Sequence, residues 1–329
     1  MKKTLTVSIA AYNVENYLRQ TLDSCIVPEV MDELEVLIVS DGATDGTVAI
    51  GKEYEAKYPN TFRVIEKKNG GYGSTVNRSM SEATGKYFRL LDGDDWFDKE
   101  GLAEYIRSLR ESEADYVINR IYTCQDGTDI RTLSDPHWGE LEGTTQNIRD
   151  IHCEFTIGIW HTTVKTEILK QHPFTLPEHT LYTDQIFIMR TMPFVHTVQF
   201  EFTPLYCYRV GRDGQSVSRE SRIKHADEEM KVVAAQVKYL STCGELTADN
   251  KEAVMSRATL YYYYGIVTLL LMPPSWKTYR RIRGFEKRTK ELMPELYRAA
   301  GKYSKKIAGM RLTGYPGYLV YAGKVENFH

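Results

Sequence analysis

Short apolar runs alternate with helix-like patterns through the first 120 residues of this 329-residue chain. Strands are predicted at residues 4–10, 34–40, 62–66, 87–91 and 116–122. Helices are predicted near residues 15–24, 47–58, 74–83 and 99–111. Because strands that alternate with helices form β-α-β units, this order predicts an α/β fold, Rossmann-like, with a mainly parallel central sheet and flanking helices.

The rest of the chain has a different pattern. Residues 124–150 are rich in Gly, Asp and Thr, which predicts loops or short strands, and a strand is predicted at 155–160. From Arg222 onward the pattern is helical. The expected parts are a sheet domain in two halves and a mainly helical C-terminal region, at residues 1–220 (1–122 and 123–220) and 221–329.

The charge, the cysteine content and the length of the apolar stretches indicate which partners and which location the protein is expected to have. The 42 Lys and Arg residues against 44 Asp and Glu residues leave a formal charge of -2, so no overall positive field indicates a nucleic-acid partner. The five cysteines include no Cys-x-x-Cys pair, which favours reduced thiols in the cytosol. The apolar stretch at 260–272 falls short of the ~20 residues that span a bilayer. A cytoplasmic protein is therefore expected.

Three carboxylates, Asp92, Asp94 and Asp95, occupy four positions directly after the apolar run at 87–91. Such a cluster repels itself unless a cation neutralises it. Mg²⁺ or Mn²⁺ binds through one or two carboxylates and completes its octahedron with phosphate oxygens and water. The motif therefore predicts a metal site at Asp92 and Asp94 for a diphosphate-bearing ligand. The alternative is a hairpin turn, since Asp-Gly is a strong turn signal.

Two further motifs follow predicted strands, where ligands of open α/β sheets bind. Asp41 can accept hydrogen bonds from a base or a ribose hydroxyl, although it could also form an Asx-turn, whereas Asp45 is expected to cap the next helix. Residues 67–74 combine two lysines with three glycines before a helix, which suits an anionic ligand or an ordinary mobile loop. Neither a P-loop nor a Gly-x-Gly-x-x-Gly after the first strand is present, which argues against ATPases and dehydrogenases.

In this order the motifs at residues 7–13, 40–47, 69–77 and 91–95 resemble those of glycosyltransferase family 2. The resemblance is clear across residues 4–109 and thinner to about residue 218. It implies a GT-A fold whose first half binds a nucleotide-sugar, commonly UDP-linked, and whose second half faces the acceptor. It also implies a metal-dependent enzyme that transfers the sugar to a hydroxyl group with inversion, in cell-surface glycan synthesis.

The resemblance assigns roles residue by residue. The expected donor-site residues are Ala11, Tyr12, Glu15, Asp41, Asn69, Gly71, Gly73 and Asp92. Asp94 is the more direct ligand of the expected Mn²⁺ or Mg²⁺, and Asp92 lies nearer the ribose or sugar. Ser40 and Ala43 stand where the family often has Asp and Ser, so the resemblance leaves the choice of base open.

The second half supplies the expected catalytic base. Asp184 matches the Asp of the family's Glu-Asp motif, in which Thr183 replaces the Glu; alternatively, either residue caps a helix. Arg209 and Arg212 flank a glycine turn and could close over the diphosphate, because guanidinium groups suit phosphate. A solvated strand end is their alternative role. Trp160 could line the acceptor pocket, although an aromatic residue at such a place is more often part of the core.

A basic C-terminal segment and two rival functions complete the predictions. Residues 277–306 carry eleven Lys and Arg residues with interleaved apolar ones, which is typical of a helix on an anionic membrane or of a solvated face. Expected partners are a nucleotide-sugar, a glycan or lipid-linked glycan acceptor, and the inner face of the cell membrane. The rivals are a sugar-phosphate nucleotidyltransferase and a catalytically inactive nucleotide-sugar-binding protein.

Overall fold

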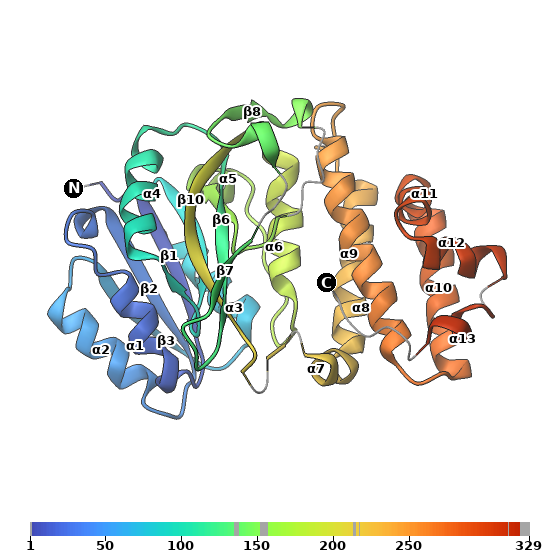
Figure 1. Ribbon diagram of the computed structural model, residues 1–329, viewed down its shortest axis with the longest axis horizontal. Coiled ribbons are helices and arrows are strands. Elements are labelled where there is room, and N and C mark those ends of the chain that lie inside the picture. Colours follow the sequence, from blue (N-terminus) through green and yellow to red (C-terminus); the bar gives the residue numbers. More distant parts are fainter. Residues whose placement is uncertain are drawn as a thin grey trace. The chain divides into compact units, whose positions relative to one another are not determined.

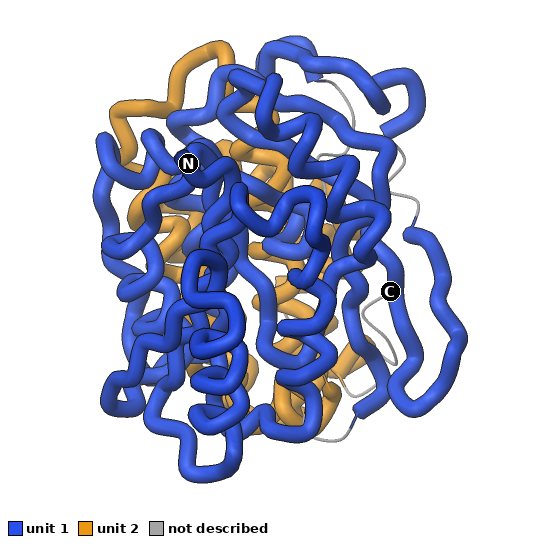
Figure 2. Tube along the Cα trace, turned by 90° about the vertical axis from the view of Figure 1, so that its left-hand side faces the viewer, with its two compact units in different colours: residues 1–213 blue, residues 214–329 orange. Residues whose placement is uncertain are grey.

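The structure, a computed structural model shown in Figure 1, describes residues 2–134, 138–151, 157–212, 215–216, 218–314 and 316–322. It divides into two compact units, residues 1–213 (unit 1) and 214–329 (unit 2), which Figure 2 colours separately. The boundary between them lies close to the division predicted at residue 220. Unit 1 holds the sheet, whereas the described elements of unit 2 are helices.

Unit 1 is built on a ten-stranded sheet in which eight strands follow the order β3-β2-β1-β4-β9-β6-β10-β5. The strands are β1 (Leu5–Ala11), β2 (Leu34–Asp41), β3 (Phe62–Lys67), β4 (Tyr87–Asp92), β5 (Trp96–Phe97), β6 (Tyr116–Gln125), β7 (Arg131–Leu133), β8 (Thr145–Asn147), β9 (Thr162–Lys165) and β10 (Thr197–Val210). β1 pairs in parallel with β2 and β4, β2 with β3, and β6 with β10, while β9 runs antiparallel between β4 and β6. The mainly parallel sheet and the five strands predicted before residue 123 are confirmed.

Helices cover both faces of the sheet. Their bounds are α1 (Glu15–Ser24), α2 (Thr47–Lys57), α3 (Tyr72–Glu82), α4 (Lys99–Glu111), α5 (Thr166–Gln171) and α6 (Thr183–Thr191). Figure 1 shows α1, α2 and α4 on one face and α3, α5 and α6 on the other. The alternation along β1 explains this, because Leu5, Val7 and Ile9 enter the core with the first group, whereas Ser8 hydrogen-bonds to Ser79 of α3 at 2.6 Å.

One strand prediction was wrong. The strand expected at 155–160 begins outside the described residues, and its remainder forms a turn in which His161 N–H donates to the carbonyl of Gly158 at 3.1 Å. The apolar side chains of Ile157 and Ile159 are buried from this turn, so the apolar run reflects burial and not a strand. β9 starts directly after it.

Unit 2 is helical, as predicted, and its helices are α7 (Arg219–Lys224), α8 (Ala226–Thr242), α9 (Lys251–Leu271), α10 (Trp276–Leu292), α11 (Pro294–Tyr303), α12 (Lys305–Leu312) and α13 (Tyr318–Tyr321). Two buried carboxylates fix their packing. Glu229 accepts from Arg222 at 3.1 Å, and Glu286 accepts from Arg311 at 2.6 Å. Within the described residues, no helix combines the length and the apolar composition that crossing a membrane requires.

Candidate active site

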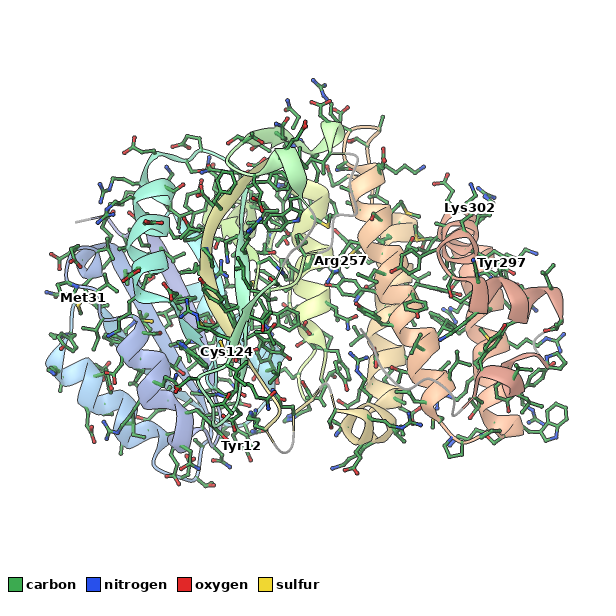
Figure 3. All side chains as sticks on the ribbon, in the orientation of Figure 1. Tyr12, Met31, Cys124, Arg257, Tyr297 and Lys302 are labelled. Atoms are coloured by element: carbon green, nitrogen blue, oxygen red, sulfur yellow. The ribbon has the colours of Figure 1, made fainter. Side chains whose placement is uncertain are left out.

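Parallel pairing gathers the ends of the central strands at one edge of the sheet. Ala10 of β1 lies opposite Asp92 of β4, and Ala11 lies opposite Ser40 of β2. Ala11 is fully buried in the core. The next residue, Tyr12, is 51% exposed and lies at the lower edge of unit 1 in Figure 3, so its ring can reach a ligand.

Asp41 shapes the glycine-rich loop. Its carboxylate is buried and accepts hydrogen bonds from Lys67 Nζ at 2.7 Å and from the N–H groups of Gly70 and Gly71 at 2.9 and 2.8 Å. The amide of Asn69 donates to the carbonyl of Asp41 at 2.9 Å. Asp41 therefore fixes the predicted donor loop, and its direct contact with a base stays a prediction.

The loop after β1 is tied to the loop after β2. Glu15 accepts from the N–H of Gly46 at 2.6 Å, and Asp45 accepts from the N–H groups of Glu15 and Thr47 at 3.1 and 3.0 Å. The N-cap of α2 is Gly46 and not Asp45 as predicted, and Asp45 instead accepts from the first helical residue from one position earlier. Glu15 thus organises the loops beside Tyr12, and its contact with a nucleotide is not tested by these bonds.

Glycines let the donor loop approach a segment that lies more than a hundred residues further along the chain. The N–H of His179 donates to the carbonyl of Gly70 at 2.6 Å. A Cβ on Gly73 would lie 2.3 Å from the carbonyl oxygen of Pro177, closer than real contacts allow. Gly71 has a φ of +79°, which favours glycine. The predicted Gly71 and Gly73 therefore position residues 177–179 as well as the loop itself.

The same segment delivers Asp184 to the carboxylates of β4. Tyr182, with a left-handed φ of 61°, precedes α6 and places Asp184 in the first turn of that helix. Burial and the negative charges of Asp94 and Asp184 raise the pKa of Asp92 to about 7, while a hydrogen bond with Tyr72 acts in the opposite direction. The structure thus brings together Asp92, Asp94 and Asp184, which the sequence predicted as metal ligands and base.

The acidic motif separates into accessible and structural carboxylates. Asp94 is partly exposed and pairs with Arg212, whose Nε donates to Asp94 Oδ2 at 2.6 Å. Asp95 is buried and accepts from the hydroxyl of Tyr206 and the N–H of Arg209, both at 2.7 Å. Asp95 therefore joins β10 to the end of β4, which leaves Asp92 and Asp94 to face a ligand.

Arg209 has other partners than the predicted diphosphate. Its side chain is buried, and its nitrogens donate to the carbonyl of Asp94 at 2.7 Å, to Asp126 Oδ1 at 2.7 Å and to Gln20 Oε1 at 2.6 Å. The guanidinium also lies 4.7 Å from the ring centroid of Trp96. Arg209 thus supports the loop that carries Asp94. Arg212 is the arginine whose side chain contacts the carboxylate of Asp94.

The tyrosines at the site, Tyr72, Tyr206 and Tyr208, were not singled out from the sequence. Tyr72 contacts Asp92, and burial together with the charges of Asp95 and Asp92 raises the pKa of Tyr208 well above its usual range. The ring centroid of Trp160 lies 4.7 Å from that of Tyr208, and the place of Trp160 in an acceptor pocket stays a prediction. Only the alternation of inward and outward residues along β10 could have indicated Tyr206 and Tyr208 from the sequence.

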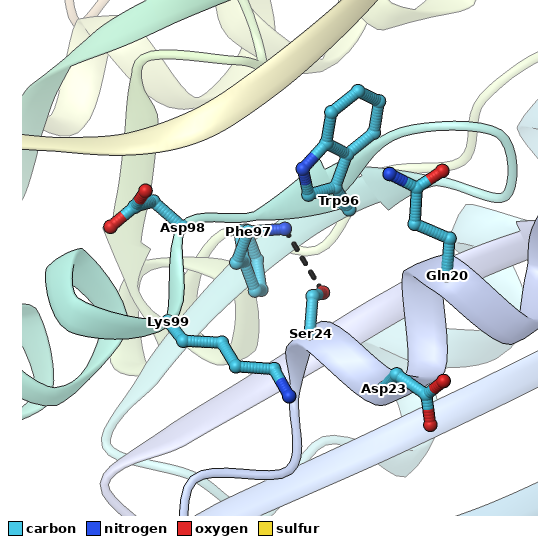
Figure 4. A pocket seen from close by; sticks show the side chains of 7 residues that line it. All are labelled: Gln20, Asp23, Ser24, Trp96, Phe97, Asp98 and Lys99. Atoms are coloured by element: carbon cyan, nitrogen blue, oxygen red, sulfur yellow. Dashed lines mark hydrogen bonds between the residues drawn. The ribbon is translucent and has the colours of Figure 1, made fainter. Parts of the chain in front are cut away.

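A separate pocket of about 470 Å³ is lined by none of these ligand-facing carboxylates. Its lining residues, drawn in Figure 4, are Gln20, Asp23, Ser24, Trp96, Phe97, Asp98 and Lys99. Ser24 Oγ accepts from the N–H of Phe97 at 3.0 Å, and Asp23 accepts from Tyr54 at 2.7 Å. These polar groups hold α1 against its neighbours, so we assign the pocket no part in catalysis.

The donor set fits a hard divalent cation that binds together with a phosphate. Among the described residues, no group of three or more His, Cys, Asp and Glu side chains could hold a metal ion by itself. Mg²⁺ and Mn²⁺ sites that use one or two carboxylates plus phosphate oxygens need no such group. Burial first, and then the negative charges of Asp94 and Asp184, raise the pKa of Asp92, and a cation beside Asp92 and Asp94 would favour the charged carboxylate.

Comparison with known proteins decides the family. The family described as "Glycosyl transferase family 2" matches residues 6–172, half of the chain. The chain belongs to glycosyltransferase family 2. Its sequence is 26% identical over 295 residues to EpsH of Bacillus subtilis, a match that covers 86% of this chain and 80% of EpsH.

Solved structures support the fold of this family member. TarS of Staphylococcus aureus, residues 1–349 in complex with UDP-GlcNAc, has a TM-score of 0.71 at 18% identity, over 99% of this chain and 93% of that one. The chain spans only 41% of full-length TarS, to which it is 26% identical over 254 residues. A mannosyltransferase from Pyrobaculum calidifontis in complex with GDP-Man and Mn²⁺ has a TM-score of 0.56 at 15% identity, over 98% and 87% of the two chains. The predicted GT-A fold with a helical C-terminal region is confirmed.

Proposed function

We propose that this glycosyltransferase moves a sugar from a UDP-sugar to a hydroxyl group of a glycan acceptor in cell-surface glycan synthesis, with inversion at the anomeric carbon. The proximity of Asp184 to Asp92 and Asp94 carries the proposal, because one site then holds carboxylates for both donor and acceptor. The TarS complex with UDP-GlcNAc supports the choice of donor, and the full name of TarS, poly(ribitol-phosphate) beta-N-acetylglucosaminyltransferase, supports a cell-surface polymer as acceptor.

On the donor side, Asp94 and Asp92 would hold Mn²⁺ or Mg²⁺, and the Mn²⁺ in the mannosyltransferase complex supports this choice. When bound, the cation neutralises charge that develops on the leaving diphosphate. Arg212, now paired with Asp94, can then turn its guanidinium to the diphosphate. Tyr12 is exposed enough to stack on the base, and Asp41 keeps the glycine-rich loop in place.

On the acceptor side, Asp184 accepts the proton of the attacking hydroxyl group. The hydroxyl oxygen forms its bond to the anomeric carbon while the bond from that carbon to the diphosphate oxygen breaks. Trp160 and Tyr208 offer ring faces beside the carboxylates, where the apolar face of an acceptor sugar can pack. A single displacement of this kind inverts the anomeric configuration.

The site of action that we propose is the cytoplasm. The described cysteines Cys25, Cys124, Cys207 and Cys243 are free. Free thiols are typical of a reducing compartment, which supports this assignment.

A panel of UDP-, GDP- and dTDP-sugars, each with and without Mn²⁺, tests the donor assignment. We expect a UDP-sugar with Mn²⁺ to bind most tightly. Its slow hydrolysis to free sugar should also be the fastest of the panel. A nucleotidyltransferase would instead release pyrophosphate from a nucleoside triphosphate and a sugar phosphate, and an inactive binding protein would bind a donor without hydrolysis. Either result, or a retained anomeric configuration in the transfer product, would contradict the proposal.

The Gly73→Ala variant tests whether the close contact between the donor loop and Pro177 positions Asp184, the proposed base. The new Cβ would meet the carbonyl oxygen of Pro177 at 2.3 Å, so residues 177–184 must shift and Asp184 with them. We expect kcat/KM to fall about ten- to a hundredfold, since small misplacements are costly in catalysis. Gly244→Ala is the control, because nothing lies within 4 Å of its Cβ. Equal kcat/KM in both variants would show that this contact does not position the base.

A further inference from the structure

Unit 2 exposes an apolar wedge formed by Trp276, Leu319 and Val320, which are 74%, 54% and 58% exposed. Two hydrogen bonds join the residues that precede Trp276 and Leu319: Ser275 N–H donates to the hydroxyl of Tyr318 at 2.8 Å, and that hydroxyl donates to the carbonyl of Ser275 at 2.7 Å. The start of α10 and helix α13 are thus joined side by side. Large exposed apolar residues grouped in this way mark an interaction surface.

A cationic surface continues from the wedge along α10. Its exposed basic residues are Lys277, Arg280, Arg283, Lys287, Arg288 and Lys290. The opposite side of the helix, with Ile282 and Glu286, is buried, and Glu286 is paired with Arg311, so it does not offset the exposed charge. One exposed acid, Glu291, lies on the helix beside these cations. The chain as a whole carries -2, so this positive surface is local.

The apolar residues that alternate with the basic ones along α10 differ in how far they are buried. Ile282 is buried in unit 2, Tyr279 and Phe285 are half-buried, and Leu292 at the end of the helix is 39% exposed. The exposed side of α10 is therefore mainly a row of cations, with the wedge at its start and Leu292 at its end. Such a surface can lie on phosphate headgroups through its cations and insert only the wedge.

We infer that the wedge and the cationic side of α10 dock unit 2 on the surface of an anionic lipid bilayer. Each Lys or Arg near such a surface strengthens binding, and tryptophan is favoured at the boundary between headgroups and acyl chains. Leu319 and Val320 stand next to Trp276 through the Ser275–Tyr318 contact, so they enter the bilayer at the same place. The inference does not depend on the proposed sugar transfer.

Vesicle binding of the full chain tests this docking. With vesicles of phosphatidylcholine and roughly one third phosphatidylglycerol, we expect flotation that raised salt suppresses, because exposed charges are screened. Pure phosphatidylcholine vesicles should bind much less protein. Brominated lipid should quench the emission of Trp276, the most exposed of the four tryptophans. Equal binding to neutral and anionic vesicles, or no quenching, would overturn the inference.

Two pairs of variants separate the contribution of this surface to vesicle binding from general effects of net charge and exposed apolar residues. Arg280→Glu with Arg283→Glu should lower the partition coefficient at least about tenfold, at ~1 kcal/mol per basic residue. The control, Lys57→Glu with Lys170→Glu, changes the net charge equally on exposed sites of unit 1 and should bind as the parent. Trp276→Ser should weaken binding severalfold, whereas Ile130→Ser, 65% exposed in unit 1, should not.

Competing occupants give different results. If Trp276→Ser dissolves a dimer in analytical ultracentrifugation while vesicle binding is absent, the wedge joins two copies of the chain and the inference is wrong. The inference is also wrong if both charge-reversed pairs weaken flotation equally, because the charge of α10 then has no specific role. Circular dichroism of each variant confirms the fold, and the salt and lipid dependence of the parent protein decides the matter without any variant.

Discussion

Replacing Asp184 with asparagine should leave donor binding intact and slow sugar transfer by about 100-fold or more. Asparagine has the size of aspartate and is tolerated in the first turn of α6, where Asp184 lies, so the helix should persist. It cannot accept the proton of the acceptor hydroxyl. The measurement is kcat at saturating donor and acceptor, together with the donor Kd by calorimetry in the presence of Mn²⁺.

Thr183→Val is the matched control for this prediction. Thr183 precedes Asp184 in the same turn of α6, and its buried hydroxyl has no hydrogen-bond partner among the described residues. Valine has nearly the same shape, so kcat should change little. Undiminished turnover of Asp184→Asn would assign the base to another residue. Loss of turnover in both variants would point to the structure of α6 instead.

The sequence was sufficient for the elements of unit 1 before residue 123 and for the helical character of unit 2, because both parts carry a local pattern. The alternation of apolar runs and helical segments predicts β1 to β4 and their helices, and the helical pattern predicts α8 to α10. The position of Asp92 and Asp94 follows from the same logic, since parallel strands present their carboxyl ends at one edge. Periodicity therefore gave the framework and the donor carboxylates.

Tertiary contacts determine which carboxylate of the acidic motif faces a ligand and which one is buried in the fold. Asp94 and Asp95 are neighbours of the same type, yet Asp95 is buried by Tyr206 and the backbone of Arg209, which lie more than a hundred residues away in sequence. The same holds for the two predicted arginines, because the burial of Arg209 depends on Gln20 of α1. No local pattern specifies which of two like residues meets such partners.

The spacing of residues in the sequence could not predict that Asp184 lies close to the donor site. It requires the contact between Gly70 and His179 and the left-handed turn at Tyr182, whose side chain gives no signal for positive φ. The prediction of Asp184 came from the resemblance to the family. The structure supplies its physical basis, a loop without side chains at Gly71 and Gly73 on which residues 177–179 rest.

Changing Asp94 to alanine should abolish the dependence of donor affinity on Mn²⁺ and lower that affinity sharply. Asp94 is a partly exposed carboxylate of the motif, whereas Asp95 holds the fold, so the variant should remain folded. Loss of the ion pair with Arg212 should cost at most about 1 kcal/mol of stability, because both groups are partly exposed. Calorimetry of UDP-sugar binding with and without Mn²⁺ measures the effect.

Arg212→Gln separates the metal from the diphosphate contact. It removes the cation that pairs with Asp94 but keeps the carboxylate, so donor affinity should fall both with and without Mn²⁺ while the ratio of the two affinities persists. In Asp94→Ala that ratio should approach one, since the chief carboxylate ligand is gone. If the Asp94 variant kept the ratio of the parent protein, the metal would be bound elsewhere, and the role of Asp94 would be reduced to holding Arg212.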